Sequence, residues 1–315
     1  MIRTQVCELL DIEIPIVQAG MGPFTSAELV AAVTNAGALG SLGTFSRPVD
    51  DLRRQLARLA DLTTGSFAVN HLVTVIDEEA FTATLDAHPR VIAFALDRPH
   101  DYVERAHDVG ALVMHQVTTV KQAYEAAERG VDIIIAQGGE SGGYCGGVAT
   151  MTLVPQVVDA VRPVPVLAAG GISDGRGLAA ALVLGAQGVN MGTRFLATAE
   201  SPIAEGYKQA IVAGESEDAV KADVWNDIMP LPGAAGYFTV PRALRTAFLD
   251  EWQPRRDLAS SNAFAREFVA ETDDAGVATL RFGDDEYGMR PPARSTTWYP
   301  WRISSSRSSR KRRPC

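Results

Sequence analysis

The sequence predicts an α/β protein folded as a (β/α)8 TIM barrel with a C-terminal, mainly helical appendage. Short apolar runs alternate with amphipathic stretches, and eight such units can be counted between about residues 14 and 214. Several runs are apolar without interruption, as in parallel strands buried on both faces. The length of 315 residues fits a barrel of about 250 residues with an additional segment. A doubly wound sheet normally stops at about five or six strands, so eight units favour a closed barrel.

The expected strands are short, and each precedes a stretch with helical periodicity. They are the runs 14–20, 38–43, 66–72, 91–96, 112–117, 132–138, 164–171 and 188–197. Amphipathic helices are expected between them, including 26–37, 50–62, 118–130 and 175–186. The first of these helices has clear boundary signals, because Ser26 can cap its N-terminus and Gly37 can end it.

The alternation stops after residue 214 and divides the chain into three parts. Residues 1–214 are expected to form the barrel, and residues 215–290 to form an appendage that covers the substrate side. Residues 291–315 are a basic tail with seven Arg and Lys and no acid, expected to be disordered and without a function. The whole chain carries a net charge of −9, so removing the charges of the tail leaves −16 on residues 1–290. So acidic a body excludes nucleic acid as a partner.

Nothing in the sequence indicates a membrane or secreted protein. It has no run of about 18 apolar residues, and its N-terminal stretch lacks the apolar region of a signal peptide. The three cysteines are scattered and odd in number, which argues against a disulfide framework and suits a cytoplasmic protein. No spacing of histidines and carboxylates indicates a metal site, and the sequence leaves the oligomeric state open.

A glycine-rich segment, AQGGESGGYCGGVAT at residues 136–150, follows a very apolar expected strand. It contains six glycines within the ten residues 138–147, too many for a helix or a packed core strand. Such a backbone can pass close to a flat or bulky ligand, and Tyr144 is the one large side chain of the loop. In a TIM barrel the chemistry lies where strands end and loops begin, as this segment does.

The ends of the last two expected strands have the composition of a phosphate site. One reads AAGGISDGRG, with Gly170 and Gly171, and the other reads NMGTRF, with Gly192 and Thr193. Main-chain N–H groups can converge on an anion where no Cβ intervenes, and the N-terminus of the following helix adds a favourable dipole. Glycines also end strands at tight turns, but two such sites on adjacent strands favour phosphate binding.

Three neutral amides lie at corresponding heights on the third, fifth and sixth expected strands: Asn70, Gln116 and Gln137. An amide can donate and accept hydrogen bonds at once, which suits the nitrogen and oxygen edge of an isoalloxazine ring or a sugar. Together with the phosphate site, these amides indicate a phosphorylated planar cofactor. FMN is the natural candidate.

The chain resembles the FMN-dependent nitronate monooxygenases, formerly called 2-nitropropane dioxygenases. The matching segments run from about residue 14 to residue 201: PIVQAGMG, ELVAAVTNAGALGSLG, FAVN, AQGGESGG and VLAAGGISDGRGLAAALVLGAQGVNMGTRFLATAES. The resemblance implies an FMN-binding oxidoreductase. By position it implies that Gly20 and Met21 lie at the flavin edge, that Asn70, Gln116 and Gln137 bond the flavin, that Gly142 approaches the ring, and that Gly170, Gly171, Gly192 and Thr193 hold the phosphate.

Tyr144 departs from the pattern of the family. Many members read AGGH where this chain reads SGGY at residues 141–144, and in those members the histidine is the catalytic base or orients the substrate. Tyr144 is therefore the candidate catalytic residue. A phenol with a pKa of about 10 is a poor base at neutral pH, but it can donate a hydrogen bond to an anion. Nitronate oxidation is compatible with this change, because a nitronate is already deprotonated, whereas efficient oxidation of neutral nitroalkanes is not expected.

Several other residues are interpreted as structural. Strand alternation turns His71 and His115 away from the barrel interior, so they are expected to pack against the helices. Cys145 has no base beside it, and Glu140 is expected to anchor the loop. Three residues beyond the barrel either cover the substrate side of the flavin or simply pack, and the sequence leaves both open: Met229, Pro230 and Tyr237.

Three functions follow as hypotheses. The first is FMN-dependent oxidation of alkyl nitronates by O2. The alternative is an NAD(P)H-dependent FMN reductase of quinones or enoyl thioesters, and the loss of the histidine makes it more plausible. The third is a catalytically silent protein that binds FMN or a phosphorylated metabolite. Reduction of bound flavin by a nitronate, by NAD(P)H or by neither would discriminate between them.

Overall fold

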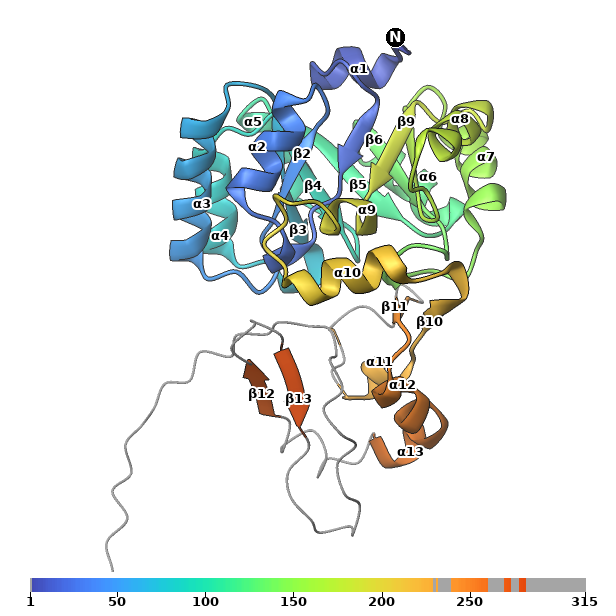
Figure 1. The fold of residues 1–315 in the computed structure, drawn as a ribbon. Coiled ribbons are helices and arrows are strands. Elements are labelled where there is room, and N and C mark those ends of the chain that lie inside the picture. The colour runs from blue at the N-terminus through green and yellow to red at the C-terminus, as the bar shows by residue number, and fades with distance from the viewer. Residues whose placement is uncertain (1, 229–230, 232–238, 260–268, 273–277, 282–315) are drawn as a thin grey trace, which may run out of the picture.

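The computed structural model describes residues 2–228, 231, 239–259, 269–272 and 278–281 (Figure 1). Met229, Pro230, Tyr237 and the tail 291–315 lie outside these described residues, so what the sequence indicates for them stays a prediction.

Eight parallel strands form one sheet that closes on itself, which confirms the (β/α)8 TIM barrel. Their order is β1-β9-β8-β6-β5-β4-β3-β2. The ring closes just before β2, where the Leu39 amide donates to the Ile16 carbonyl at 3.0 Å and the Gln18 amide donates to the Leu39 carbonyl at 2.8 Å. The strands are β1 (Ile16–Gln18), β2 (Gly40–Gly43), β3 (Phe67–Leu72), β4 (Val91–Ala95), β5 (Leu112–Val117), β6 (Ile133–Gln137), β8 (Val166–Ala169) and β9 (Gly188–Met191).

Helices follow the strands and surround the barrel (Figure 1). The expected boundary signals of the first one are confirmed, since Ser26 Oγ accepts from the Leu29 amide at 3.3 Å and Gly37 has a φ of +84° just beyond its end. The helices are α2 (Ala27–Asn35), α3 (Val49–Leu62), α4 (Glu78–Asp86), α5 (Tyr102–Asp108), α6 (Val120–Glu128), α7 (Thr150–Val161), α8 (Gly175–Val183), α9 (Thr193–Leu196) and α10 (Glu205–Ala213).

The last barrel strand is shorter than the run predicted at 188–197. It ends at Met191, and α9 begins at Thr193. The prediction was wrong at this end because Phe195 and Leu196 continue the apolar run, and an apolar run alone does not distinguish a strand from a buried helical turn.

One helix was not predicted from the sequence. α1 (Gln5–Leu10) lies at the end of the barrel opposite α10 (Figure 1). Val6, Cys7 and Leu10 are fully buried and belong to one cluster with Val17, Met114 and other residues of the barrel interior. α1 therefore closes the amino-terminal end of the barrel, and Cys7 is a core residue.

The appendage adds a second, antiparallel sheet. Its described residues include strands as well as helices: β10 (Ala219–Lys221), α11 (Val224–Ile228), β11 (Val240–Leu244), α12 (Ala247–Trp252), α13 (Arg256–Ala259), β12 (Val269–Thr272) and β13 (Ala278–Arg281). β11 pairs with β10 on one side and with β7 (Gly143–Cys145) on the other. β7 lies inside the glycine-rich segment, so the appendage is joined to that segment by main-chain hydrogen bonds. Within the described part of the chain, no helix combines the length and apolar character needed to span a bilayer.

Candidate active site

A large cavity opens at the carboxyl ends of the barrel strands. Its volume is about 910 Å³, and it is lined mainly by residues of the βα loops, of β7 and of α10. All residues that the sequence assigns to the cofactor or to catalysis lie along its wall: Gly20, Met21, Asn70, Gln116, Gln137, Gly142, Tyr144, Gly170, Gly171, Gly192 and Thr193. The structure therefore brings the predicted flavin, phosphate and catalytic residues into one space.

Strand alternation places the amides inside the barrel and the histidines outside it. His71 is buried between the sheet and α4, where its ring nitrogens lie 3.1 Å from Thr44 Oγ1 and 3.0 Å from Thr84 Oγ1. Burial lowers the pKa of His71 to about 3 and that of His115 to about 4. The interpretation of both as packing residues is confirmed, and neither lines the cavity.

Two residues that the sequence reasoning missed also line this cavity. The side chains of Asn190 and Ser41 are 7% and 2% exposed, and neither Asn190 Oδ1 nor Ser41 Oγ has a hydrogen-bond partner among the described residues. Gln137 Oε1 is also buried without a hydrogen-bond partner among the described residues. Gln137 and Asn190 are both in register with Ala169 on β8, so the two amides lie at one height. Strand alternation applied to the quoted NMGTRF segment could have found Asn190.

These unpartnered atoms provide a test of whether the site fits a polar ligand. A buried polar atom without a partner costs free energy comparable to a lost hydrogen bond, so it is expected to meet one in the complete molecule. Gln137 and Asn190 both line the cavity, and their amide side chains pair with groups that donate and accept hydrogen bonds, such as a ring N–H or sugar hydroxyls. The donor and acceptor pattern of a flavin supplies such groups.

The predicted phosphate side consists of exposed main chain with little room for side chains. Gly170 and Gly171 have φ values of +107° and +70°, which side chains rarely permit. A Cβ on Gly142 would lie 2.9 Å from Thr193 Oγ1. The amides of Gly171 and Thr193 donate no hydrogen bond to any described residue. These residues therefore fit a phosphate that approaches the main chain.

One detail of the predicted phosphate site differs. The sequence indicated that the helix after the Gly170–Gly171 pair adds its N-terminal dipole. In the structure, Asp174 caps that helix, α8, by accepting from the amides of Arg176 at 2.9 Å and Gly177 at 3.4 Å. The carboxylate occupies two amides of the first turn of α8, so the predicted phosphate site would rest on the strand-end glycines and Thr193.

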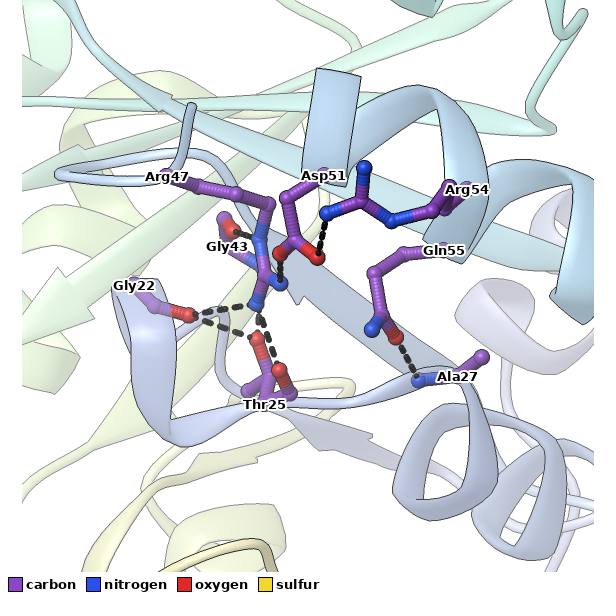
Figure 2. A network of polar contacts seen from close by, with 8 residues as sticks. All are labelled: Gly22, Thr25, Ala27, Gly43, Arg47, Asp51, Arg54 and Gln55. Carbon is purple, nitrogen blue, oxygen red and sulfur yellow. Dashed lines mark hydrogen bonds and ion pairs between the residues drawn. The ribbon is translucent and has the colours of Figure 1, made fainter. Parts of the chain in front are cut away.

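The loop after β1 is held by a buried arginine. Figure 2 shows Arg47, whose side chain is 5% exposed, donating to the carbonyls of Gly43 at 2.9 Å, Gly22 at 3.3 Å and Thr25 at 2.5 Å. Asp51 accepts from the same guanidinium at 2.6 Å and balances its charge. Gly22 begins the 3-10 turn directly after the predicted flavin-edge residues. We call these five residues the Arg47 network; it fixes the loop at the cavity rim.

Tyr144 lies in a part of the cavity that has no strong base. Burial raises the pKa of its phenol to about 12. Among the described residues that line the cavity there is no histidine, and the carboxylates are Glu140 and Glu215. Glu140 accepts from the Thr150 amide at 2.9 Å and from Thr150 Oγ1 at 2.8 Å, which is the anchoring role expected of it. Cys145 is buried and does not line the cavity, and burial raises the pKa of its thiol, so it is not a reactive nucleophile.

A family profile described as nitronate monooxygenase matches residues 3–84 and 76–224, which is more than half of the chain. The chain belongs to the nitronate monooxygenase family. This confirms the resemblance drawn from the sequence, and it establishes the protein as an oxidoreductase enzyme.

Two relatives of this nitronate monooxygenase family member carry different names. It is 38% identical over 279 residues to a (3aS,4S,5R,7aS)-5-hydroxy-7a-methyl-1-oxo-octahydro-1H-indene-4-carboxyl-CoA dehydrogenase of Mycobacterium tuberculosis, covering 87% of this chain and 73% of that protein. It is 34% identical over 265 residues to a probable nitronate monooxygenase of Staphylococcus aureus, covering 69% of this chain and 74% of that protein.

Solved structures support the same placement. FabK from Thermotoga maritima matches with a TM-score of 0.74 at 36% identity, covering 81% of this chain and 78% of FabK. A nitroalkane oxidase from Streptomyces ansochromogenes matches with a TM-score of 0.69 at 27% identity, covering 79% of this chain and 81% of that one. The family member described here also has, within its described residues, no group of three His, Cys, Asp or Glu side chains that could hold a metal ion.

Proposed function

We propose that this protein is an FMN-dependent oxidoreductase that oxidises alkyl nitronates with O2. The observation that carries the proposal is the chemistry around Tyr144. Its phenol has a pKa of about 12, and no histidine is found among the described residues of the cavity wall. A site of this kind suits a substrate that arrives already deprotonated.

The residues of the cavity support FMN as the cofactor. The amides of Gln137 and Asn190, which line the cavity, would hydrogen-bond the ring and the ribityl chain, and the strand-end glycines with Thr193 would hold the phosphate. When bound, FMN would take electrons from the substrate and pass them to O2. The phosphate would enter as a dianion, and main-chain amides with a hydroxyl can bind it without a cation.

Tyr144 would orient the substrate rather than remove a proton. At neutral pH its hydroxyl is a donor, and a nitronate carries its negative charge on two oxygens that accept hydrogen bonds. The carbon-bound proton of a neutral nitroalkane would need a base with a pKa nearer to neutrality. The proposed substrate is therefore the nitronate and not its conjugate acid.

The proposal is tested by mixing the FMN-loaded protein anaerobically with ethyl nitronate and, separately, with nitroethane. We expect the flavin absorbance to bleach rapidly with ethyl nitronate and only slowly with nitroethane. A flavin that no nitronate reduces would rule out the proposed function. Admission of O2 should then restore the absorbance and form the oxidised product.

A second function is suggested by the relative named a carboxyl-CoA dehydrogenase, a name that indicates redox chemistry on a CoA thioester. In this alternative, NAD(P)H reduces the cofactor and an enoyl thioester or quinone is the acceptor. Tyr144 would then act as the proton donor, because its raised pKa keeps the phenol protonated at physiological pH. The same anaerobic experiment with NADH and NADPH discriminates, since this alternative predicts bleaching by a nicotinamide without any nitronate.

A further inference from the structure

The cavity extends beyond the residues assigned to FMN into a region whose wall is largely apolar and also includes Glu215 and Arg242. Six uncharged residues of its wall come from α10 and from the β10–β11 pair, and we call them the apolar lobe: Tyr207, Ile211, Val212, Ala219, Ala243 and Leu244. α10 lies across the end of the barrel at which the cavity opens (Figure 1). The lobe is therefore continuous with the proposed active site, but it is formed by segments outside the βα units.

The sheet of the appendage links the lobe to Tyr144. β11 pairs with β7 so that Pro241 faces Tyr144, and its far end pairs with β10 so that Leu244 faces Ala219. A Cβ on Gly214, just after α10, would lie 3.4 Å from Leu244 Cδ2. One continuous wall thus runs from the phenol to the end of α10, and a group extending from a substrate at Tyr144 along this wall would reach the lobe.

The apolar side chains of the lobe are incompletely covered in the protein itself. α10 has no buried residue, and Val212 is 74% exposed. Tyr207 and Ile211 are four residues apart and so share one face of the helix. An apolar surface that stays open next to a substrate cavity is typical of a site for an apolar ligand.

We infer that the apolar lobe binds the hydrocarbon chain of the substrate, so that the preferred substrates carry an extended apolar chain on the reacting carbon. This inference rests on the proposed function for the identity of the reacting group. The occupant is the substrate chain itself, because the lobe belongs to the same cavity as Tyr144 and its six residues carry no charge, although Glu215 and Arg242 also line this part of the cavity. Nitronates with a short chain, such as ethyl nitronate, would leave the lobe empty.

The inference predicts a dependence on chain length. Each methylene group moved from water into an apolar site favours binding by about fourfold. For the series ethyl, butyl and hexyl nitronate, kcat/KM of anaerobic flavin reduction should therefore rise by about this factor per methylene until the lobe is full. A flat series in which ethyl nitronate is active would overturn the lobe and leave the proposed function standing.

Substitution in the lobe should remove this dependence. In Ile211→Ser the ratio of kcat/KM for hexyl over ethyl nitronate should fall by about tenfold, and Leu244→Ala should act in the same direction. The matched control is Val183→Ser on α8, because Val183 is 88% exposed and does not line the cavity. Its ratio should equal that of the wild type. Wild-type ratios in both lobe variants would overturn the inference.

A binding measurement separates the lobe from the chemistry. Calorimetry of the FMN-loaded protein with n-octanol should show binding with a negative heat-capacity change, weaker binding of n-butanol, and loss of the n-octanol signal in Ile211→Ser. If no nitronate reduces the flavin but this pattern is seen, the proposed function fails and the lobe stands. If n-octanol binds no better than n-butanol, the lobe fails.

Discussion

Tyr144 and Pro241 face each other in the antiparallel pairing of β7 with β11. This pair joins the glycine-rich segment after β6 to the appendage, and the adjacent pairs Arg242–Gly143 and Val240–Cys145 continue it. The phenol is thus positioned by main-chain bonds on a sheet outside the barrel. Pro241 has no N–H and cannot donate a main-chain hydrogen bond, so the pairing of the two strands depends on the adjacent residue pairs. The side chain of Tyr144 faces the cavity.

Substitution of Tyr144 should change which form of the substrate reacts. In Tyr144→Phe, kcat/KM for ethyl nitronate should fall by about 10- to 100-fold, because one hydrogen bond to a charged group is lost. In Tyr144→His, the imidazole supplies a base near neutral pH, so nitroethane should become a substrate. Anaerobic flavin reduction measures both. A Tyr144→Phe enzyme that is as fast as the wild type would show that the phenol does not contact the substrate.

The pH profile of nitronate oxidation follows from the same residue. Burial raises the pKa of Tyr144 to about 12, so the hydroxyl remains a donor through neutral and mildly alkaline pH. We expect kcat/KM for ethyl nitronate to show no loss assignable to Tyr144 until the pH approaches 12. A decline near pH 10 that disappears in Tyr144→Phe would show instead that the phenol ionises as it does in water.

Thr193 should contribute to the binding of the phosphate and not of the ring. Thr193→Val keeps the shape of the side chain and removes its hydroxyl, so the dissociation constant for FMN should rise by about tenfold or more. Riboflavin lacks the phosphate, and its dissociation constant should not change. Both are measured by quenching of flavin fluorescence. If the binding of FMN and of riboflavin weakened equally, the Thr193 hydroxyl would not contact the phosphate.

The Arg47 network should hold the loop after β1 in the conformation that binds FMN. Arg47→Met removes a buried donor from Asp51 and from three carbonyl groups, so the free energy of unfolding should fall by about 3 kcal/mol and FMN should bind about tenfold more weakly. Arg54→Met is the charge-matched control, because Arg54 also bonds Asp51, at 3.0 Å, but is 70% exposed. It should change neither quantity appreciably.

A second control separates positioning from stability in this experiment. Leu52 is fully buried on α3 and does not line the cavity. Leu52→Ala should destabilise the protein by about 2–5 kcal/mol without weakening FMN binding. If it weakens FMN binding as much as Arg47→Met does, the arginine acts only through general stability.

The barrel and much of its wall follow from periodic patterns in the sequence. Alternation along β3 places Asn70 inward and His71 outward, because successive side chains of a strand point to opposite faces. Arg47 left no such signal, since its partners are main-chain oxygens of a loop. The pairing of β7 with β11 could not be predicted from the sequence either, because the bonded residues Cys145 and Val240 are 95 positions apart and β7 contains glycine. Local pattern predicts elements, whereas these contacts depend on how distant loops meet.

The two buried histidines should make the protein acid-sensitive. Burial lowers the pKa of His71 to about 3 and of His115 to about 4, whereas a histidine in the unfolded chain has a pKa of about 6.5. The stability they contribute is therefore present above pH 6.5 or so and is lost as the pH falls toward 4, since only the unfolded chain then takes up the protons. Each histidine should add about 1.4 kcal/mol per pH unit to that slope. Urea unfolding at several pH values gives the slope of the free energy of unfolding against pH. In His71→Phe this slope should be shallower by the contribution of one proton, even if the variant is less stable at neutral pH. A slope equal to that of the wild type would mean that His71 accepts a proton in the folded protein.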